Sequence, residues 1–185
     1  MKALIFNGTL EKRTNSTSGK LSSYLLQKLN SYGVDTKIFH LSDANIPLFN
    51  TEYSKTPIAV KRMNQSFTEA DIHFWLSPLY HGGIPGVMKN CIDWLELSST
   101  FPKPYLADKT VGLLCWADGV QAMQGINAMD AIAKSLRAWT LPFSVPIVRG
   151  ELFDQAQPDA LSRNYQDKID RLISISVSRK IELVG

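Results

Sequence analysis

The sequence alternates short apolar runs with segments of helical periodicity, and this alternation restricts the fold more than any other feature. Strands are expected at 3–7, 34–41, 72–77, 110–116 and 143–148. Alternation of this kind is typical of βα units that build a parallel sheet. A chain of 185 residues, 44% of them hydrophobic, is long enough to bury a sizeable core. We therefore predict an α/β protein with one domain spanning residues 1–185.

Helical periodicity fills the stretches between the expected strands. Leu21, Leu25 and Leu29 share one face of a helix that ends before Gly33, a residue typical of a C-terminal cap. The remaining helices are expected at 57–70, from 85 to about 95, around 129–136, and at about 159–179.

Two strands have the character of sheet edges, and this fixes a strand order. The segment 34–41 alternates polar and apolar residues, and Pro146 lies inside the last strand, where a central position would not tolerate it. Two such edges fit the order 2-1-3-4-5 of a five-stranded, flavodoxin-like three-layer doubly wound sandwich. In that order the loops after strands one, three and four meet at the carboxyl edge, where ligands bind.

Composition excludes several classes of protein. The net charge of +3 is small and its cations are dispersed, so nucleic acid is not an expected partner. No apolar window is long enough to span a membrane, and the N-terminal apolar run is too short for a signal peptide, so we expect a cytoplasmic protein. Cys91 and Cys115 form no CxxC or zinc spacing, so no metal site is predicted and both are expected to be buried.

The loop after the first strand, Gly8 to Ser18, has the composition of a phosphate site. It combines several hydroxyl side chains, the adjacent cations Lys12 and Arg13, and the start of a helix. Free backbone N–H groups and the helix dipole at such a point attract phosphate. Ser and Thr are also ordinary N-caps, so a purely structural role stays open. GxxxxGK[ST] and GxGxxG are both absent, which argues against ATP hydrolysis and a Rossmann dinucleotide site.

The loop after the third strand carries a specific resemblance. Residues 78–94, PLYHGGIPGVMKNCIDW, resemble the stretch PEYNGSIPGVLKNAIDW of the NADPH-dependent FMN reductase family, which includes flavin, quinone, azo-dye and chromate reductases. The first loop resembles the family's G-S-x-R-x-x-S-x-N/T phosphate loop, with about two extra residues inside it.

The resemblance implies an FMN-containing oxidoreductase that transfers a hydride from NADPH (or NADH) to flavin N5. The electrons then pass to a small acceptor such as a flavin, a quinone, an azo or nitro compound, or a metal oxyanion. It implies no catalytic side chain, because the flavin carries the chemistry, and it suggests a homodimer or homotetramer. The phosphate would be held by Thr9, Ser16, Thr17 and Ser18 with Lys12 or Arg13, and the flavin ring would be lined by Pro78, Leu79, Tyr80, His81 and Gly82 and by Trp116, Asp118 and Gly119.

Departures from the family pattern keep two other functions open. Leu79 replaces the usual Glu, His81 the usual Asn, and Trp116 a smaller residue. A flavodoxin-like electron carrier is one alternative, and a non-catalytic flavodoxin-fold binding module is the other. His81 could hydrogen-bond the flavin or the substrate, or simply face solvent. The sequence leaves open the acceptor, the choice between NADPH and NADH, and whether FMN is a prosthetic group or a substrate.

Overall fold

A parallel sheet forms the centre of the molecule in the computed structural model, which describes residues 1–52 and 54–178. The strand order is β2-β1-β3-β4-β5, with β6 also paired to β4, and every pairing is parallel. This confirms the predicted order and the flavodoxin-like class. The strands are β1 (Lys2–Asn7), β2 (Asp35–His40), β3 (Ile72–Pro78), β4 (Thr110–Ala117), β5 (Trp139–Thr140) and β6 (Val145–Val148).

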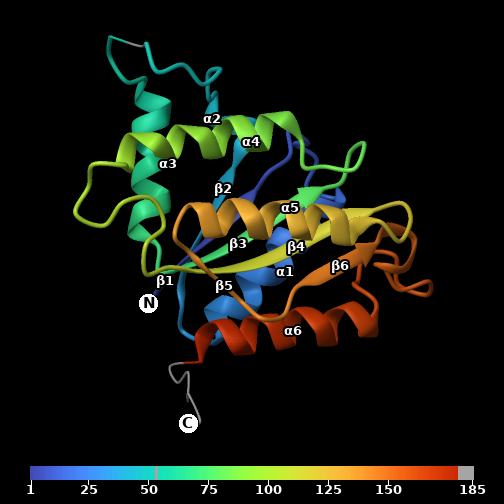
Figure 1. Cartoon of the computed structure of the whole chain (residues 1–185). Coiled ribbons are helices and arrows are strands. Elements are labelled where there is room, and N and C mark those ends of the chain that lie inside the picture. Colours follow the sequence, from blue (N-terminus) through green and yellow to red (C-terminus); the bar gives the residue numbers. More distant parts are fainter. Residues whose placement is uncertain (53, 179–185) are drawn as a thin grey trace.

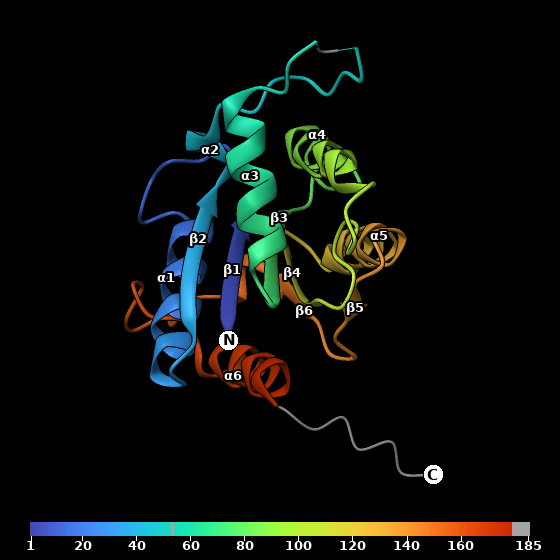
Figure 2. The same ribbon diagram turned by 90° about the vertical axis from the view of Figure 1, so that its left-hand side faces the viewer.

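Helices cover both faces of this sheet, as Figures 1 and 2 show. On one face α3, α4 and α5 build a core with the strands, and on the other α1 and α6 build a second core. The helices are α1 (Thr17–Ser31), α2 (Leu41–Ala44), α3 (Ile58–Glu69), α4 (Gly86–Asp93), α5 (Ala122–Ser135) and α6 (Arg163–Val177), with 3₁₀ turns at Trp94–Ser98 and Arg149–Glu151.

Alternate side chains of each central strand supply the two cores, as the geometry of a strand requires. Phe6 of β1 and Trp75 of β3 pack on the α3 side, with their ring centroids 6.3 Å apart, whereas Ile5 and Phe74 enter the core beneath α1 and α6. All of β3 is buried. β2 alternates exposed and half-buried residues, which confirms it as an edge strand.

Helix α1 ends as the sequence predicts. Gly33 takes a φ of 71°, its N–H donates to the Asn30 carbonyl at 2.9 Å, and the Val34 N–H donates to the Leu29 carbonyl at 3.1 Å. These two bonds form a Schellman motif, in which glycine avoids the steric cost of the left-handed conformation.

The sheet has six strands instead of the five that were predicted. The strand expected at 143–148 is β6, and it is preceded by β5, a two-residue strand at Trp139 that the sequence pattern did not show and that pairs with β4 nearer the start of β4. Pro146 lies in β6, which among the described residues pairs with β4 alone, so its edge position is confirmed. α2 was also not predicted, and α5 begins at Ala122, before the helix expected around 129–136.

The last helix starts four residues later than predicted, at Arg163. The preceding segment is held as a turn instead, because the Asp154 carboxylate accepts the N–H groups of Ala156 and Gln157 at 2.8 and 3.0 Å, and Phe153 forms a bridge with Leu161. The predicted helix end at Arg179 lies outside the described residues.

Both cysteines are buried and unpaired, as predicted. Burial raises the pKa of the Cys115 thiol to about 12 and also raises that of Cys91. In the part of the chain that the structure describes, no helix is both long and apolar enough to cross a membrane.

His73 of β3 makes stability depend on pH. Its ring is fully buried beside Phe67, and this burial, with Lys109 nearby, lowers the pKa of His73 from 6.5 to about 3. Above pH 6.5 the ring is neutral in both states. Below it the unfolded chain binds a proton that the folded one excludes, so stability falls as the pH drops toward 3.

Replacing His73 with Leu should remove this dependence. Between pH 7 and pH 5, we expect the unfolding free energy of the wild-type protein to fall by about 2 kcal/mol more than that of the His73→Leu variant. Equilibrium urea unfolding at both pH values measures the difference. Parallel pH slopes for the two proteins would contradict this assignment.

Candidate functional site

The loops after β1, β3 and β4 lie side by side because hydrogen bonding continues past the strand ends. The Gly8 N–H donates to the Leu76 carbonyl at 2.9 Å, and the Leu79 N–H donates to the Trp116 carbonyl at 2.8 Å. The loops that follow β1 and β3 are therefore each fixed at their start to the neighbouring strand by a backbone bond.

A cavity of about 790 Å³ opens between these loops and the segment after β6. This volume falls in the range that small-molecule and cofactor sites occupy. Its walls are polar toward α1 and aromatic toward β3 and β4. The lining residues are Thr9, Leu10, Glu11, Arg13, Asn15, Ser16, Thr17, Pro78, Tyr80, Pro85, Val87, Trp116, Arg149 and Phe153.

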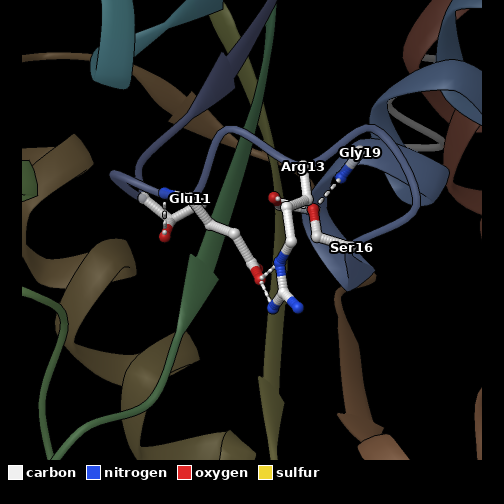
Figure 3. Close-up of polar contacts among 6 residues, drawn as sticks. Glu11, Arg13, Ser16 and Gly19 are labelled. Carbon is white, nitrogen blue, oxygen red and sulfur yellow. Dashed lines mark hydrogen bonds and ion pairs between the residues drawn. The ribbon is translucent and has the colours of Figure 1, made fainter.

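The start of α1 forms the polar end of the cavity. The Ser16 hydroxyl accepts the Gly19 N–H at 3.1 Å and so caps the helix (Figure 3). Among the hydrogen bonds of the described residues, none uses the backbone N–H of Thr17 or Ser18. Ser16 is thus a cap and also part of the cavity wall, and the helix end keeps donors for an anion.

Gly19 lets the loop close tightly on the first turn of α1. A Cβ built on Gly19 would lie 2.3 Å from the carbonyl oxygen of Thr14, a backbone atom that cannot rotate away. Any larger residue would push the loop off the helix and widen the polar end of the cavity.

The structure separates the two adjacent cations of the loop. Arg13 lines the cavity, where its Nε donates to the Glu11 carboxylate at 3.1 Å and its Nη2 contacts the same oxygen (Figure 3). Lys12 lies outside this cavity, 3.4 Å from the Asp43 carboxylate. Arg13 is therefore the one of these two cations that lines the cavity, and it is paired there with Glu11.

The turn after β3 forms the aromatic end. Tyr80 and Gly83 exchange backbone hydrogen bonds at 2.9 and 3.0 Å, and His81 and Gly82 between them have φ values of 49° and 83°. Two positive φ values define a tight type I′ turn. The turn holds Tyr80 at the cavity, which Trp116 of β4 also lines.

The cavity brings together half of the residues expected to bind the cofactor: Thr9, Arg13, Ser16, Thr17, Pro78, Tyr80 and Trp116. The others lie around it. Ser18 is fully buried, with its hydroxyl 3.1 Å from that of Ser16, and Leu79 faces Gly125 of α5. Lys12, His81, Gly82, Asp118 and Gly119 are also absent from its lining.

Two residues that sequence reasoning missed line the cavity from the segment after β6. Arg149 forms an ion pair with Asp118, with Nη2 at 2.7 Å from the carboxylate, and Phe153 lies under the Lys20 ammonium of α1, which is 4.5 Å from the ring centroid. The sequence did carry a signal for these two residues, because both follow a parallel strand at its carboxyl end, where ligands bind in such sheets.

A second cavity, of about 770 Å³, adjoins the first and shares Leu10, Tyr80, Pro85 and Val87 with it. Its remaining walls come from the segment after β2, which contributes Leu41, Ile46 and Leu48, and from residues 81–90, among them His81. Val87 of α4 is 38% exposed and lines both cavities. Among the described residues, no group of three or more His, Cys, Asp or Glu side chains is arranged to hold a metal ion.

Comparisons with a family model, with known sequences and with solved structures agree with one another. The family model described as NADPH-dependent FMN reductase matches residues 1–151. An FMN-dependent NADPH-azoreductase of Staphylococcus aureus is 26% identical over 152 residues, which cover 78% of this chain and 76% of that protein. Two solved flavoenzymes share the fold at 16% identity.

The first of these structures is FerB, an NAD(P)H:(acceptor) oxidoreductase from Paracoccus denitrificans, with a TM-score of 0.72 and coverage of 95% of this chain and 94% of that one. The second is the apo form of an NADH:FMN oxidoreductase, EmoB, with a TM-score of 0.74 and coverage of 97% and 91%.

Replacing Gly19 with Ala should disturb this site. We expect a loss of about 1–3 kcal/mol in unfolding free energy, because the new methyl group clashes with the Thr14 carbonyl. Ligand affinity at the polar end should fall as well. Gly86→Ala in α4 is the matched control, since nothing lies within 4 Å of its added Cβ. Thermal unfolding of both variants tests the clash, which equal stability of the two would refute.

Proposed function

We propose, because this chain belongs to the NADPH-dependent FMN reductase family, that the cavity at the ends of β1, β3 and β4 is its FMN site. The chain is an NAD(P)H-dependent flavin oxidoreductase that uses FMN and NADPH. The observation that carries the site assignment is a single cavity joining an anion-binding helix start to an aromatic turn.

The donor set at the polar end fits a phosphate. The hydroxyls of Thr9, Ser16 and Thr17 and the guanidinium of Arg13 face this part of the cavity. The backbone N–H groups at the start of α1 add the positive end of the helix dipole. These groups would hold the FMN phosphate. Ser18 would act indirectly, by fixing the hydroxyl of Ser16.

The aromatic end fits a flat ring. Pro78 and Trp116 are buried and form a firm wall, whereas Tyr80 is 60% exposed and can cover a ring from the solvent side. The turn through His81 and Gly82 brings backbone groups close to this end. These residues would orient the isoalloxazine and exclude water from one side of it.

When bound, FMN would supply the redox chemistry of this reaction, which is hydride acceptance from the nicotinamide and electron transfer to an acceptor. The chain's own residues bind and orient the reactants, and no side chain is assigned as a catalytic acid or base. The adjoining apolar cavity, with His81 at its edge, is the proposed place for a small-molecule acceptor.

Three broader features of the protein are also proposals. Residues 1–185 would form one flavodoxin-like FMN-binding domain in a cytoplasmic protein. A homodimer or homotetramer is supported by exposed apolar side chains at the helices that follow β3 and β4, including Val87, Leu97, Phe101 and Met123.

The first test is a spectrum of the purified protein with FMN, followed by anaerobic addition of NADPH. We expect NADPH to bleach the flavin when the protein is present. Binding of FMN without bleaching would favour an electron carrier that needs a reductase, and the absence of both NADPH- and NADH-dependent reduction would contradict the proposed activity. Lack of any FMN binding would favour the non-catalytic module.

Replacing Thr17 with Val tests the phosphate assignment separately. Thr17 lines the cavity but does not cap the helix, so the change should weaken FMN binding by about tenfold or more, because it removes one hydrogen bond to a charged group. Riboflavin binding and unfolding free energy should stay near wild type. Thr51→Val, at an exposed turn, is the control. Fluorescence titration measures both flavins, and equal losses for the two would place the phosphate elsewhere.

A further inference from the structure

We propose that the Glu11 carboxylate competes with the flavin phosphate for Arg13, so that this site discriminates weakly between FMN and riboflavin and exchanges FMN readily. The inference rests on the proposed FMN site and goes beyond it, because it assigns Glu11 as the residue that sets phosphate specificity.

The contact between Glu11 and Arg13 lies in the cavity wall itself. Nε and Nη2 of Arg13 both donate to the same carboxylate oxygen, and both residues line the polar end (Figure 3). The Glu11 side chain is 31% exposed, compared with 76% for Arg13. The Glu11 N–H donates to the Thr9 hydroxyl at 3.2 Å, which fixes the backbone of Glu11 to the loop.

The charges around the cavity are balanced within the chain. The charged lining residues are Glu11, Arg13 and Arg149, and Arg149 is paired with Asp118 just outside. Each arginine therefore has a carboxylate partner. A phosphate entering this cavity finds no uncommitted guanidinium among the described residues that line it.

Carboxylate and phosphate make the same kind of charge-assisted contact with a guanidinium. A phosphate that takes Arg13 must displace the Glu11 carboxylate, which then stays nearby as a like charge because its backbone is tied to Thr9. The binding free energy that the phosphate gains from Arg13 is therefore only the difference between two similar contacts, one of Arg13 with the phosphate and one of Arg13 with Glu11. Phosphate recognition is therefore reduced to the hydroxyl and backbone donors of the loop.

The carboxylate belongs to the part of the loop that departs from the family pattern. Glu11, Lys12 and Arg13 fall across the stretch where the loop is about two residues longer than the pattern that it resembles. Lys12 turns away to Asp43, and Glu11 turns toward Arg13. This part of the loop thus places the negative charge of Glu11 at the phosphate end of the cavity. The positive charge of Lys12 lies outside the cavity, beside Asp43.

The test compares dissociation constants for FMN and for riboflavin, which lacks the phosphate, in wild type and Glu11→Gln. We expect Glu11→Gln to bind FMN about tenfold more tightly, because it frees a charge-assisted contact, and to leave riboflavin affinity within about twofold of wild type. Glu69→Gln makes the same charge change at the far end of α3, where Glu69 is exposed, and should alter neither constant.

A double-mutant cycle tests whether Glu11 affects FMN binding through Arg13. Arg13→Gln alone should weaken FMN binding only slightly, because Glu11 already occupies this arginine. In the Glu11→Gln background the same change should cost about tenfold, and so cancel the gain. Both residues lie on the surface loop, and Glu11→Ala gives the same comparison if the glutamine variant folds poorly.

The outcomes separate this inference from the proposed function. Wild type that binds and reduces FMN, with Glu11→Gln no tighter, would overturn the competition and leave the function intact. An equal gain for riboflavin would also overturn it, because the carboxylate would then act on the ring. Failure of wild type and every variant to bind or reduce FMN would overturn the proposed function itself.

Discussion

The in-register pairing of β1, β3 and β4 is the constraint on which the site depends. Asn7, the last residue of β1, pairs with Leu76, and Pro78, the last residue of β3, pairs with Trp116, so the ends of the three strands are staggered by only one or two residues along the same edge. Apolar burial on both faces keeps them there, because a shift by one residue would exchange the side chains that enter the two cores. Apolar burial has no preferred direction, but because it holds the strand register it also fixes the distances between the three loops. The hydrogen bond from Gly8 to Leu76 extends this order into the first of these loops.

The loops themselves are held by polar contacts that a ligand can replace. A polar end with two uncompensated arginines and a free helix start would concentrate positive charge in the absence of a ligand. Pairing Arg13 with Glu11 and Arg149 with Asp118 relieves that repulsion. Exposed ion pairs of this kind contribute little to stability, so their exchange for a ligand group costs the fold little. The sheet is the rigid part of the site, and the ion-paired side chains of its loops are the part that can rearrange.

The sequence predicts the elements better than it predicts side-chain directions. Strand order, the edge strands and the glycine cap follow from periodicity and local chemistry, which short segments determine on their own. The later start of α6 depends on the Asp154 turn, and the additional strand β5 depends on pairing with β4, which the local sequence pattern does not show. The choice between Lys12 and Arg13 depended on Asp43, a partner about thirty positions along the chain that only the fold brings near.

Resemblance and topology find different parts of such a site. A family pattern identifies positions that relatives share, such as Ser16 or Pro78, but it has no clean counterpart for residues that fall across an insertion, such as Glu11. Phe153 falls beyond the matched segment, which ends at residue 151. Topology finds it, because a chain that leaves β6 at the carboxyl edge must pass the same cavity as the loops before it. The residues that distinguish this chain from its relatives are therefore best sought where the sheet places them and the family pattern does not.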